Sequence, residues 1–208
     1  MAIGDLLGKL KGREKVEPKK FLALLLTDEV VQAAVWRVSE AQTEIIALGT
    51  PVEWDGETGT TNELITAADA TLSSAMEGIT GEMNEVILGV PYSWTDKNGI
   101  LGSKRDLIRK INKELELKPL GYVTMTDSVL TFLKMQEGTP STAIIIQVTH
   151  AELTLVLVRL GRIENIVNID RSSEVVKDVV EGIASLKTNE NLPSRIILFN
   201  NMHGLDEM

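Results

Sequence analysis

The 208-residue sequence contains no cysteine and only two histidines, His150 and His203. Without thiolates the chain cannot form a disulfide, hold an iron–sulfur cluster or use a cysteine nucleophile, and two imidazoles leave little for zinc or acid–base chemistry. Long apolar runs are also missing: the most apolar stretches, such as residues 21–26, are strand-sized. A membrane-spanning helix needs roughly 18 such residues. The N-terminus shows no secretory signal pattern, so a cytoplasmic location is predicted.

Basic residues are scarce relative to acidic ones, with 21 Lys and Arg against 30 Asp and Glu. The imbalance lies in the body of the chain, because residues 1–20 hold 6 basic and 3 acidic side chains, which leaves 15 basic and 27 acidic for the rest. An acidic body repels phosphate groups, which argues against nucleic-acid binding as its main role. With 43% apolar and 25% charged residues, the composition is that of a folded protein.

The basic N-terminal arm, residues 1–20, carries an apolar stripe. Ile3, Leu6, Leu7 and Leu10 follow the i, i+3, i+4, i+7 spacing of an amphipathic helix. Such a helix can lie on an anionic membrane or dock in the groove of a protein partner. Helices shorter than about 12 residues are marginal on their own, so the alternative is a disordered leader.

Hydrophobic periodicity divides the rest of the chain into two similar halves. In the first half, three strands precede a helix that begins with a capping box formed by Thr60 and Glu63. A strand, a helix capped at Ser103, another strand and a last helix at 127–137 follow. The predicted strands are residues 21–27, 30–38, 44–48, 85–90 and 121–125. The order of the first half is therefore βββαβαβα.

The same order starts again in the second half of the chain. A tight turn is predicted at Gly161–Arg162, and a helix capped by Ser172 or Ser173 follows the third strand. The predicted strands are residues 143–148, 153–160, 163–169 and 195–199.

This repeat predicts an α/β protein with two similar lobes. We expect the arm at residues 1–20, the first lobe at 21–138 and a second, incomplete lobe at 139–208.

Four segments make the repeat specific: LALLLTDEVVQAAVW at 22–36, VILGVPYSW at 86–94, IIIQVT at 144–149 through RLGRI at 159–163, and IILFNNMHGL at 196–205. With these segments in this order, the chain resembles the actin-like ATPase superfamily. Within this superfamily, the amino-acid sequence is most similar to the bacterial PilM-type pilus assembly proteins and FtsA-type cell division proteins. The resemblance implies duplicated RNase H-like (actin-like) βββαβαβα lobes that face each other across a nucleotide site.

Members of this superfamily hold Mg-ATP with two hairpins, each bearing a carboxylate and a glycine, and with a glycine pair after the last strand. The carboxylate lies near Mg²⁺, and glycine lets backbone N–H groups close on the phosphates. The matching positions here are Leu25 and Thr27, Gln147 and Thr149, and Asn200–Asn201. The resemblance therefore implies a degenerate site that binds no ATP or Mg²⁺ and does not hydrolyse nucleotide.

These departures favour a non-catalytic scaffold in a membrane-associated assembly, such as a type IV pilus or a secretion machine, at the inner face of the membrane. The partner that the PilM resemblance implies is a short peptide of an inner-membrane protein. One alternative is an ATP-binding, polymerising division protein of the FtsA type, with ATP and Mg²⁺ as cofactors. Another is a fragment whose function lies in further residues.

No catalytic or metal-ligating set emerges from the remaining residues. Asp28 and Glu29 fall in the first hairpin turn and are interpreted as solvated turn residues rather than metal ligands. His150 and Glu152 form a possible acid–base pair, yet no nucleophile lies near them in the sequence. Trp36 alternates with other apolar residues of its strand and is predicted to lie in the core.

Overall fold

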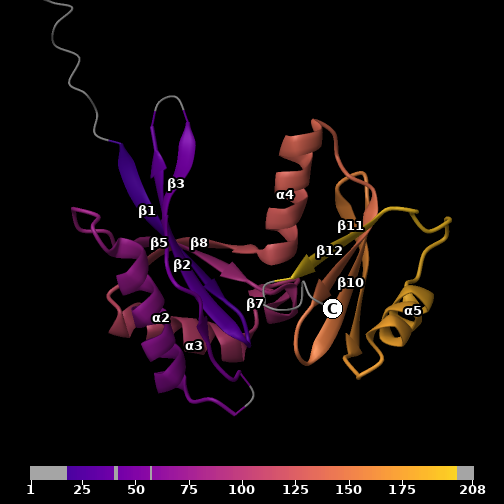
Figure 1. Cartoon of the computed structure of the whole chain (residues 1–208), viewed down its shortest axis with the longest axis horizontal. Helices are drawn as coiled ribbons and strands as arrows, with labels where there is room; N and C mark the ends of the chain where they lie inside the picture. Colours follow the sequence, from indigo (N-terminus) through magenta and orange to yellow (C-terminus); the bar gives the residue numbers. More distant parts are fainter. Residues whose placement is uncertain (1–17, 40–41, 57, 201–208) are drawn as a thin grey trace, which may run out of the picture.

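The computed structural model describes residues 18–39, 42–56 and 58–200. Its strands form two main sheets that lie side by side (Figure 1). In the first sheet the strand order is β3-β2-β1-β5-β8, and β4 pairs with β2. The strands are β1 (Lys19–Leu26), β2 (Val30–Val38), β3 (Thr43–Leu48), β4 (Val52–Glu53), β5 (Glu85–Val90) and β8 (Lys118–Thr124), beside a separate hairpin of β6 (Thr95–Asp96) and β7 (Gly99–Ile100).

The second sheet repeats this arrangement with the order β11-β10-β9-β12. β1 pairs with β2 in antiparallel fashion and with β5 in parallel fashion, and β9 pairs in the same two ways with β10 and β12. The strands are β9 (Ala143–Val148), β10 (Glu152–Arg159), β11 (Arg162–Asp170) and β12 (Ile196–Asn200). The two halves therefore share one topology, as the repeated sequence pattern predicts.

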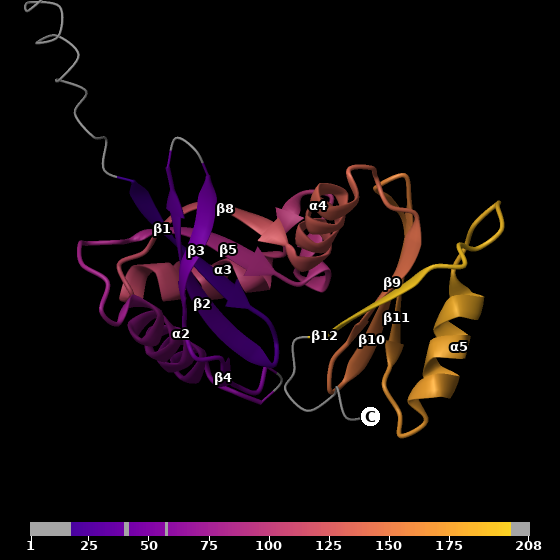
Figure 2. The ribbon, with the colours of Figure 1, turned by 45° about the horizontal axis from the view of Figure 1, so that its top comes forward.

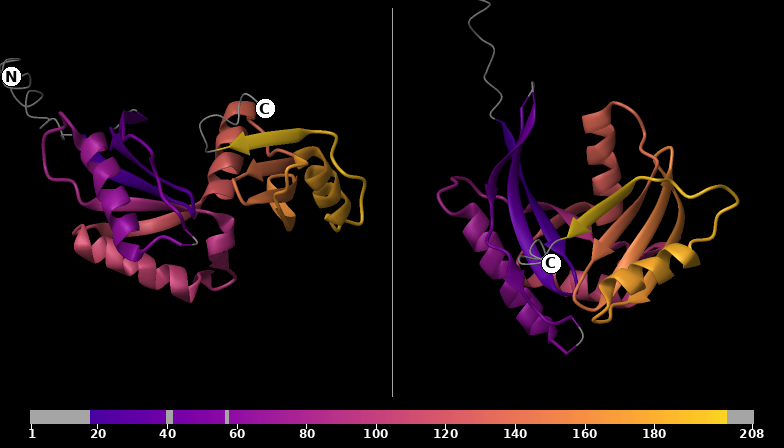
Figure 3. Two further views of the ribbon diagram at one scale, coloured as in Figure 1. Left: turned by 60° about the horizontal axis from the view of Figure 1, so that its bottom comes forward. Right: turned by 45° about the vertical axis from the view of Figure 1, so that its right-hand side comes forward.

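Helices lie against both sheets (Figure 2). Helices α2 (Thr61–Met76) and α3 (Gly102–Glu114) pack on one face of the first sheet, and α5 (Val175–Ser185) packs on one face of the second. Helix α4 (Met125–Glu137) follows the last strand of the first sheet and packs against the second sheet, on the face opposite α5. Figure 3 shows α4 beside the second sheet in both further views. This helix therefore links the two halves.

Alternation along the first strand of each sheet builds the two cores. Leu22, Leu24 and Leu26 of β1 are fully buried beneath α2 and α3. The matching residues of β9 are Ile144, Ile146 and Val148, which are buried beneath α5. Each such side chain contributes about 1.5–3 kcal/mol when it leaves water. The residues between them, which include Leu25 and Gln147, point to the opposite face of their sheet.

Of the helix N-caps predicted from the sequence, one is confirmed and two are wrong. The predicted capping box of α2 is confirmed, since the Thr60 hydroxyl accepts from the Glu63 N–H and the Glu63 carboxylate accepts from the Thr60 N–H. The predicted cap at Ser103 is wrong: α3 begins one residue earlier, and its N-cap, Leu101, offers no side-chain acceptor. The predicted cap at Ser172 or Ser173 is also wrong, because the N-cap of α5 is Glu174. Ser172 donates instead to the buried carboxylate of Asp178.

Two further expectations need correction. The β10–β11 turn lies at Leu160–Gly161, both with positive φ, one residue before the predicted turn. Trp36 is half-buried rather than part of the core, and it stacks on Phe21 with ring centroids 4.9 Å apart, on the face of the sheet that α2 does not cover.

The apolar residues of the N-terminal arm, Ile3, Leu6, Leu7 and Leu10, lie outside the described residues, so its predicted docking stays a prediction. None of the helices in the described part of the chain is long and apolar enough to cross a membrane.

One glycine allows the close approach of α2 to the first sheet. A Cβ atom added to Gly49 would lie 2.2 Å from the backbone oxygen of Thr71 in α2. The Thr71 hydroxyl also accepts from the backbone N–H of Ala33 on β2, at 2.9 Å, so the helix cannot shift without losing this bond.

We therefore expect Gly49→Ala to destabilise the fold by about 1–3 kcal/mol, the usual cost of overpacking. The shift in the midpoint of urea unfolding measures this loss of stability. Gly102→Ala is the matched control, since a Cβ there meets nothing within 4 Å. Equal stability of the two variants would contradict the close packing of α2.

Candidate functional site: the cleft between the sheets

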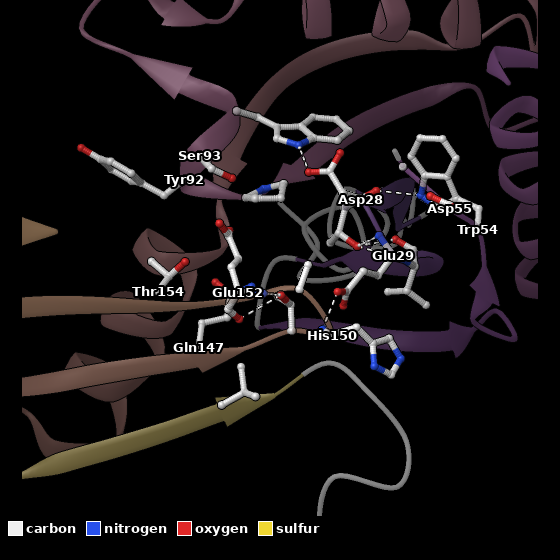
Figure 4. A pocket seen from close by; sticks show the side chains of 18 of the residues that line it. Asp28, Glu29, Trp54, Asp55, Tyr92, Ser93, Gln147, His150, Glu152 and Thr154 are labelled. Atoms are coloured by element: carbon white, nitrogen blue, oxygen red, sulfur yellow. Dashed lines mark hydrogen bonds between the residues drawn. The ribbon is translucent and has the colours of Figure 1, made fainter. Parts of the chain in front are cut away.

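A cavity of about 980 Å³ lies where the two halves meet, and residues of both halves line it. The first half contributes the β1–β2 turn, the loop at 53–56, the short helix η1 (Tyr92–Trp94) and Lys104 of α3. The second half contributes the β9–β10 turn, Thr154 and Asp170. Figure 4 shows these side chains around the cavity.

The first hairpin turn is closed by a threonine hydroxyl. Thr27 Oγ1 donates to the backbone oxygen of Val30 at 2.9 Å. Thr27 Oγ1 also accepts from the backbone N–H of Val30 at 2.9 Å and of Glu29 at 3.2 Å. The backbone N–H of Thr27 also donates to the Val30 oxygen. The turn thus satisfies the N–H groups of Thr27, Glu29 and Val30.

The second hairpin turn repeats these bonds with Thr149. Its Oγ1 donates to the backbone oxygen of Glu152 at 3.0 Å and accepts from the backbone N–H of Glu152 at 3.0 Å. Its own N–H donates to the Glu152 oxygen, also at 3.0 Å. Thr27 and Thr149 therefore occupy equivalent positions in the two halves and have the same local role.

These bonds matter for anion binding, because a phosphate loop needs backbone N–H groups that face the ligand. In both turns the threonine hydroxyl oxygen already accepts hydrogen bonds from backbone N–H groups of the hairpin. Threonine also brings a Cβ and a methyl group to a position where glycine would let the backbone approach a ligand closely. These bonds occupy the N–H groups of Glu29 and Val30 in the first turn and of Glu152 in the second.

The tip of the first turn is fixed by the loops around it. Trp94 Nε1 donates to Asp28 Oδ2 at 2.7 Å, and the Lys104 ammonium lies 2.6 Å from Asp28 Oδ1 and 4.3 Å from the Trp94 ring centroid. Trp54 Nε1 donates to the backbone oxygen of Thr27 at 2.8 Å. Asp28 is therefore a structural acceptor as well as a turn residue whose side chain is 42% exposed.

The two turns touch across the cleft. The backbone N–H of His150 donates to Glu29 Oε1 at 2.5 Å, which joins the tip of one hairpin to the tip of the other. His150 thus acts here through its backbone, and within the described residues no hydrogen bond joins its ring to Glu152.

Polar residues of the second sheet form the wall of the cavity. Gln147, Glu152, Thr154 and Asp170 line it together. Glu152 and Asp170 are direct cross-strand partners, as are Gln147 and Thr154. Burial raises the pKa of Glu152 above its ordinary value of 4.5, and the negative charges of Asp28, Asp170 and Glu29 raise it further, against a lowering hydrogen bond from Thr154.

The positions that the resemblance assigns to the nucleotide site divide into three groups. Thr27, Gln147 and Thr149 line the cavity, whereas Leu25 is not among its lining residues. Asn200 ends β12, and Asn201 lies outside the described residues. The role of all these positions as a degenerate nucleotide site stays a prediction.

Other residues of the site gave no signal in the sequence. Trp94 and Lys104 lie 66 and 76 positions from Asp28, so no local pattern connects them. Asp170 is found only through the strand register. Within the described residues, no three His, Asp or Glu side chains converge to hold a metal ion.

Solved structures share this architecture. The Ppx/GppA enzyme of Aquifex aeolicus aligns with a TM-score of 0.51 over 87% of this chain and 67% of its own, at 10% identity. The ethanolamine utilization protein EutJ of Carboxydothermus hydrogenoformans aligns with a TM-score of 0.53 over 88% of this chain and 64% of its own, at 14% identity. A Bacteroides thetaiotaomicron protein with an actin-like ATPase fold and unknown function aligns with a TM-score of 0.54 over 90% and 84%, at 8% identity.

These similarities confirm that the chain has the actin-like fold. At such low identity they show the fold alone. No protein-family model matches the sequence, and no curated protein matches it. The chain spans about two thirds of the length of the Ppx/GppA and EutJ structures.

The raised pKa of Glu152 gives a prediction about stability. A carboxyl whose pKa is higher in the folded state holds its proton more tightly there, so stability falls as pH rises from the unfolded value of 4.5 through the folded value. The loss of folding stability caused by ionised Glu152 is present at neutral pH and absent well below pH 4.5. Glu152→Gln removes it.

We expect this variant to gain roughly 0.2–1 kcal/mol at neutral pH, the range for like charges opposed across two strands. Thermal unfolding near pH 7 should show a rise of about 1–4 °C, with no gain near pH 4. Glu181→Gln, at an exposed position of α5, serves as control. Two results would contradict this account: a loss of stability of Glu152→Gln at neutral pH, or an equal gain in the control. Either would show that the ionised Glu152 carboxylate does not destabilise the fold.

Proposed function

We propose that this actin-like chain is a non-catalytic scaffold that binds a protein partner through the cleft between its halves. The observation that carries the proposal is the pair of hairpin turns closed by Thr27 and Thr149, whose hydroxyls occupy the N–H groups that a phosphate would need. The cleft is thereby a surface for recognition and not a phosphate site.

The charge of the cavity supports the same conclusion. Six carboxylates line it, against the single lysine Lys104, which Asp28 already binds. Two like charges 4 Å apart repel by about 4 kcal/mol at an effective dielectric constant of about 20. A nucleoside triphosphate would meet this repulsion without an N–H cradle or a free cation among the described lining residues to offset it.

Aromatic side chains give the cleft a means of protein recognition. Trp54, Tyr92 and Trp94 line the cavity from the first half, and Tyr92 is only half-buried. Tyrosine and tryptophan often supply the most binding energy at protein interfaces, because they bury a large apolar area and keep a polar group available.

Binding of nucleotide tests the proposal directly. A ligand at about 100 times its Kd stabilises the folded state by about 2.7 kcal/mol, which a thermal-shift titration detects. We expect millimolar ATP with Mg²⁺ to leave the melting temperature of the full chain unchanged, and calorimetry to show no heat of binding.

An unrelated Mg-ATP-binding protein in the same assay provides the positive control. A rise in melting temperature that depends on both ATP and Mg²⁺ would overturn the proposal in favour of an ATP-binding, polymerising protein of the FtsA type.

The wider setting rests on the sequence resemblance and the basic arm. We place the scaffold in the cytoplasm, in a membrane-associated assembly such as a type IV pilus or secretion machine, where the partner is a segment of an inner-membrane protein. The apolar stripe of the arm and its net positive charge suit weak binding to an anionic membrane.

Co-sedimentation of the full chain with anionic liposomes tests this setting. We expect binding that weakens at high salt, and a several-fold loss in the variant Leu6→Ser/Leu7→Ser. Neutral liposomes are the control. Equal sedimentation of the variant and the unaltered chain would exclude the arm as a membrane anchor.

A further inference from the structure

The wall of the cavity holds two carboxylates without a cation. Glu152 and Asp170 face each other directly across β10 and β11. None of the ion pairs among the described residues involves either of them. Like charges opposed across two strands destabilise a sheet, so a sheet that keeps them gains from a positive group placed between them.

An amide beside these carboxylates also lacks a partner. Gln147 is only 7% exposed, lines the cavity and is adjacent to Thr154 in the strand register. Its side chain makes no hydrogen bond to another described residue, and Figure 4 shows it next to Glu152. Because Gln147 lines the cavity and its amide makes no hydrogen bond within the described residues, this group is placed for a ligand that donates to its oxygen or accepts from its nitrogen.

The opposite wall already binds a cation in the same manner. Lys104 lies between the Asp28 carboxylate and the face of Trp94. This lysine is the only Lys or Arg among the described residues that line the cavity, and its ammonium group is engaged. The acceptors at Glu152, Asp170 and Gln147 are therefore left for a positive group from outside.

We propose that the cavity receives an arginine side chain from an exposed segment of the partner protein, with its guanidinium group held by Glu152, Asp170 and the amide oxygen of Gln147. This assignment rests on the proposed function and names the chemistry of the partner. A guanidinium group carries five N–H donors in a planar fork, which suits two carboxylates and an amide oxygen better than the single ammonium point of lysine. The cavity is also large enough for a side chain together with part of its backbone.

Titration of the full chain with the terminally blocked tripeptide Gly-Arg-Gly tests the proposal, with chemical shifts of backbone amides as the readout. Gly-citrulline-Gly is the matched control ligand, because citrulline has nearly the same shape without the charge. We expect the arginine peptide to bind at least about tenfold more tightly than the citrulline peptide, with shifts at Gln147, Glu152 and Asp170, and to weaken as salt rises.

The protein variants Glu152→Gln and Asp170→Asn should each weaken the arginine peptide about tenfold, whereas Glu181→Gln should leave its affinity unchanged. The melting temperature of each variant shows that it is folded. Equal affinity for the arginine and citrulline peptides, or loss of binding in none of the cavity variants, would overturn the proposal.

Two further experiments test for other occupants of the cavity. Tighter binding of spermidine than of the arginine peptide would make the cavity a site for a small polyamine and would overturn the partner assignment. Binding of the peptide only after neutralisation of the arm, by Lys9→Gln, Lys11→Gln, Arg13→Gln and Lys15→Gln, would assign the cavity to the arm of this chain instead. A null result with every cation, together with no binding of Mg-ATP, overturns the arginine site and leaves the non-nucleotide scaffold in place.

Discussion

The hydroxyl groups of Thr27 and Thr149 set the character of the cleft, because each one fixes a hairpin tip by bonding the backbone on both sides of its turn. The tips then meet through the bond from the His150 N–H to Glu29, and the loops that carry Trp54 and Trp94 pack on the first tip. A tip with free N–H groups would be an anion site. With these N–H groups bonded within the turns, the side chains that line the surface between the halves include six carboxylates and the aromatic rings of Trp54, Tyr92 and Trp94.

This arrangement separates the fold from the chemistry that the fold often hosts. Two sheets that share the order of four strands, β3-β2-β1-β5 and β11-β10-β9-β12, are kept by buried aliphatic residues of β1 and β9. Among the described residues, Leu22, Leu24, Leu26, Ile144 and Ile146 of these cores do not line the cavity, so the cleft can change its ligand while the fold persists. Glu152 and Asp170, which are opposed across β10 and β11, are an example. Their negative charges make the binding of an anion in the cleft less favourable and the binding of a cation more favourable.

Much of the fold could be predicted from the sequence, because strand alternation and the repeat of βββα depend on local patterns. The strands at 30–38, 85–90 and 143–148 agree with prediction to the residue. The predicted helix caps agree less well: Ser103 has the right residue type for a cap, but α3 starts at Gly102 and its N-cap, Leu101, makes no side-chain hydrogen bond. In the site, the resemblance points to Thr27 and Thr149 from the sequence alone, and their role as replacements for glycine stays a prediction. That their hydroxyls close the turns, and that Trp94 and Lys104 reach Asp28, depends on contacts that only the folded chain creates.

Hydrogen exchange of individual amides, followed by NMR, tests the central claim most directly. Because Thr27 and Thr149 hold the N–H groups of Val30 and Glu152, these two amides should exchange slowly in the full chain, and saturating Mg-ATP should leave their rates unchanged. Fast exchange of both amides that becomes slow when Mg-ATP is added would show instead that the turns are open and receive phosphate.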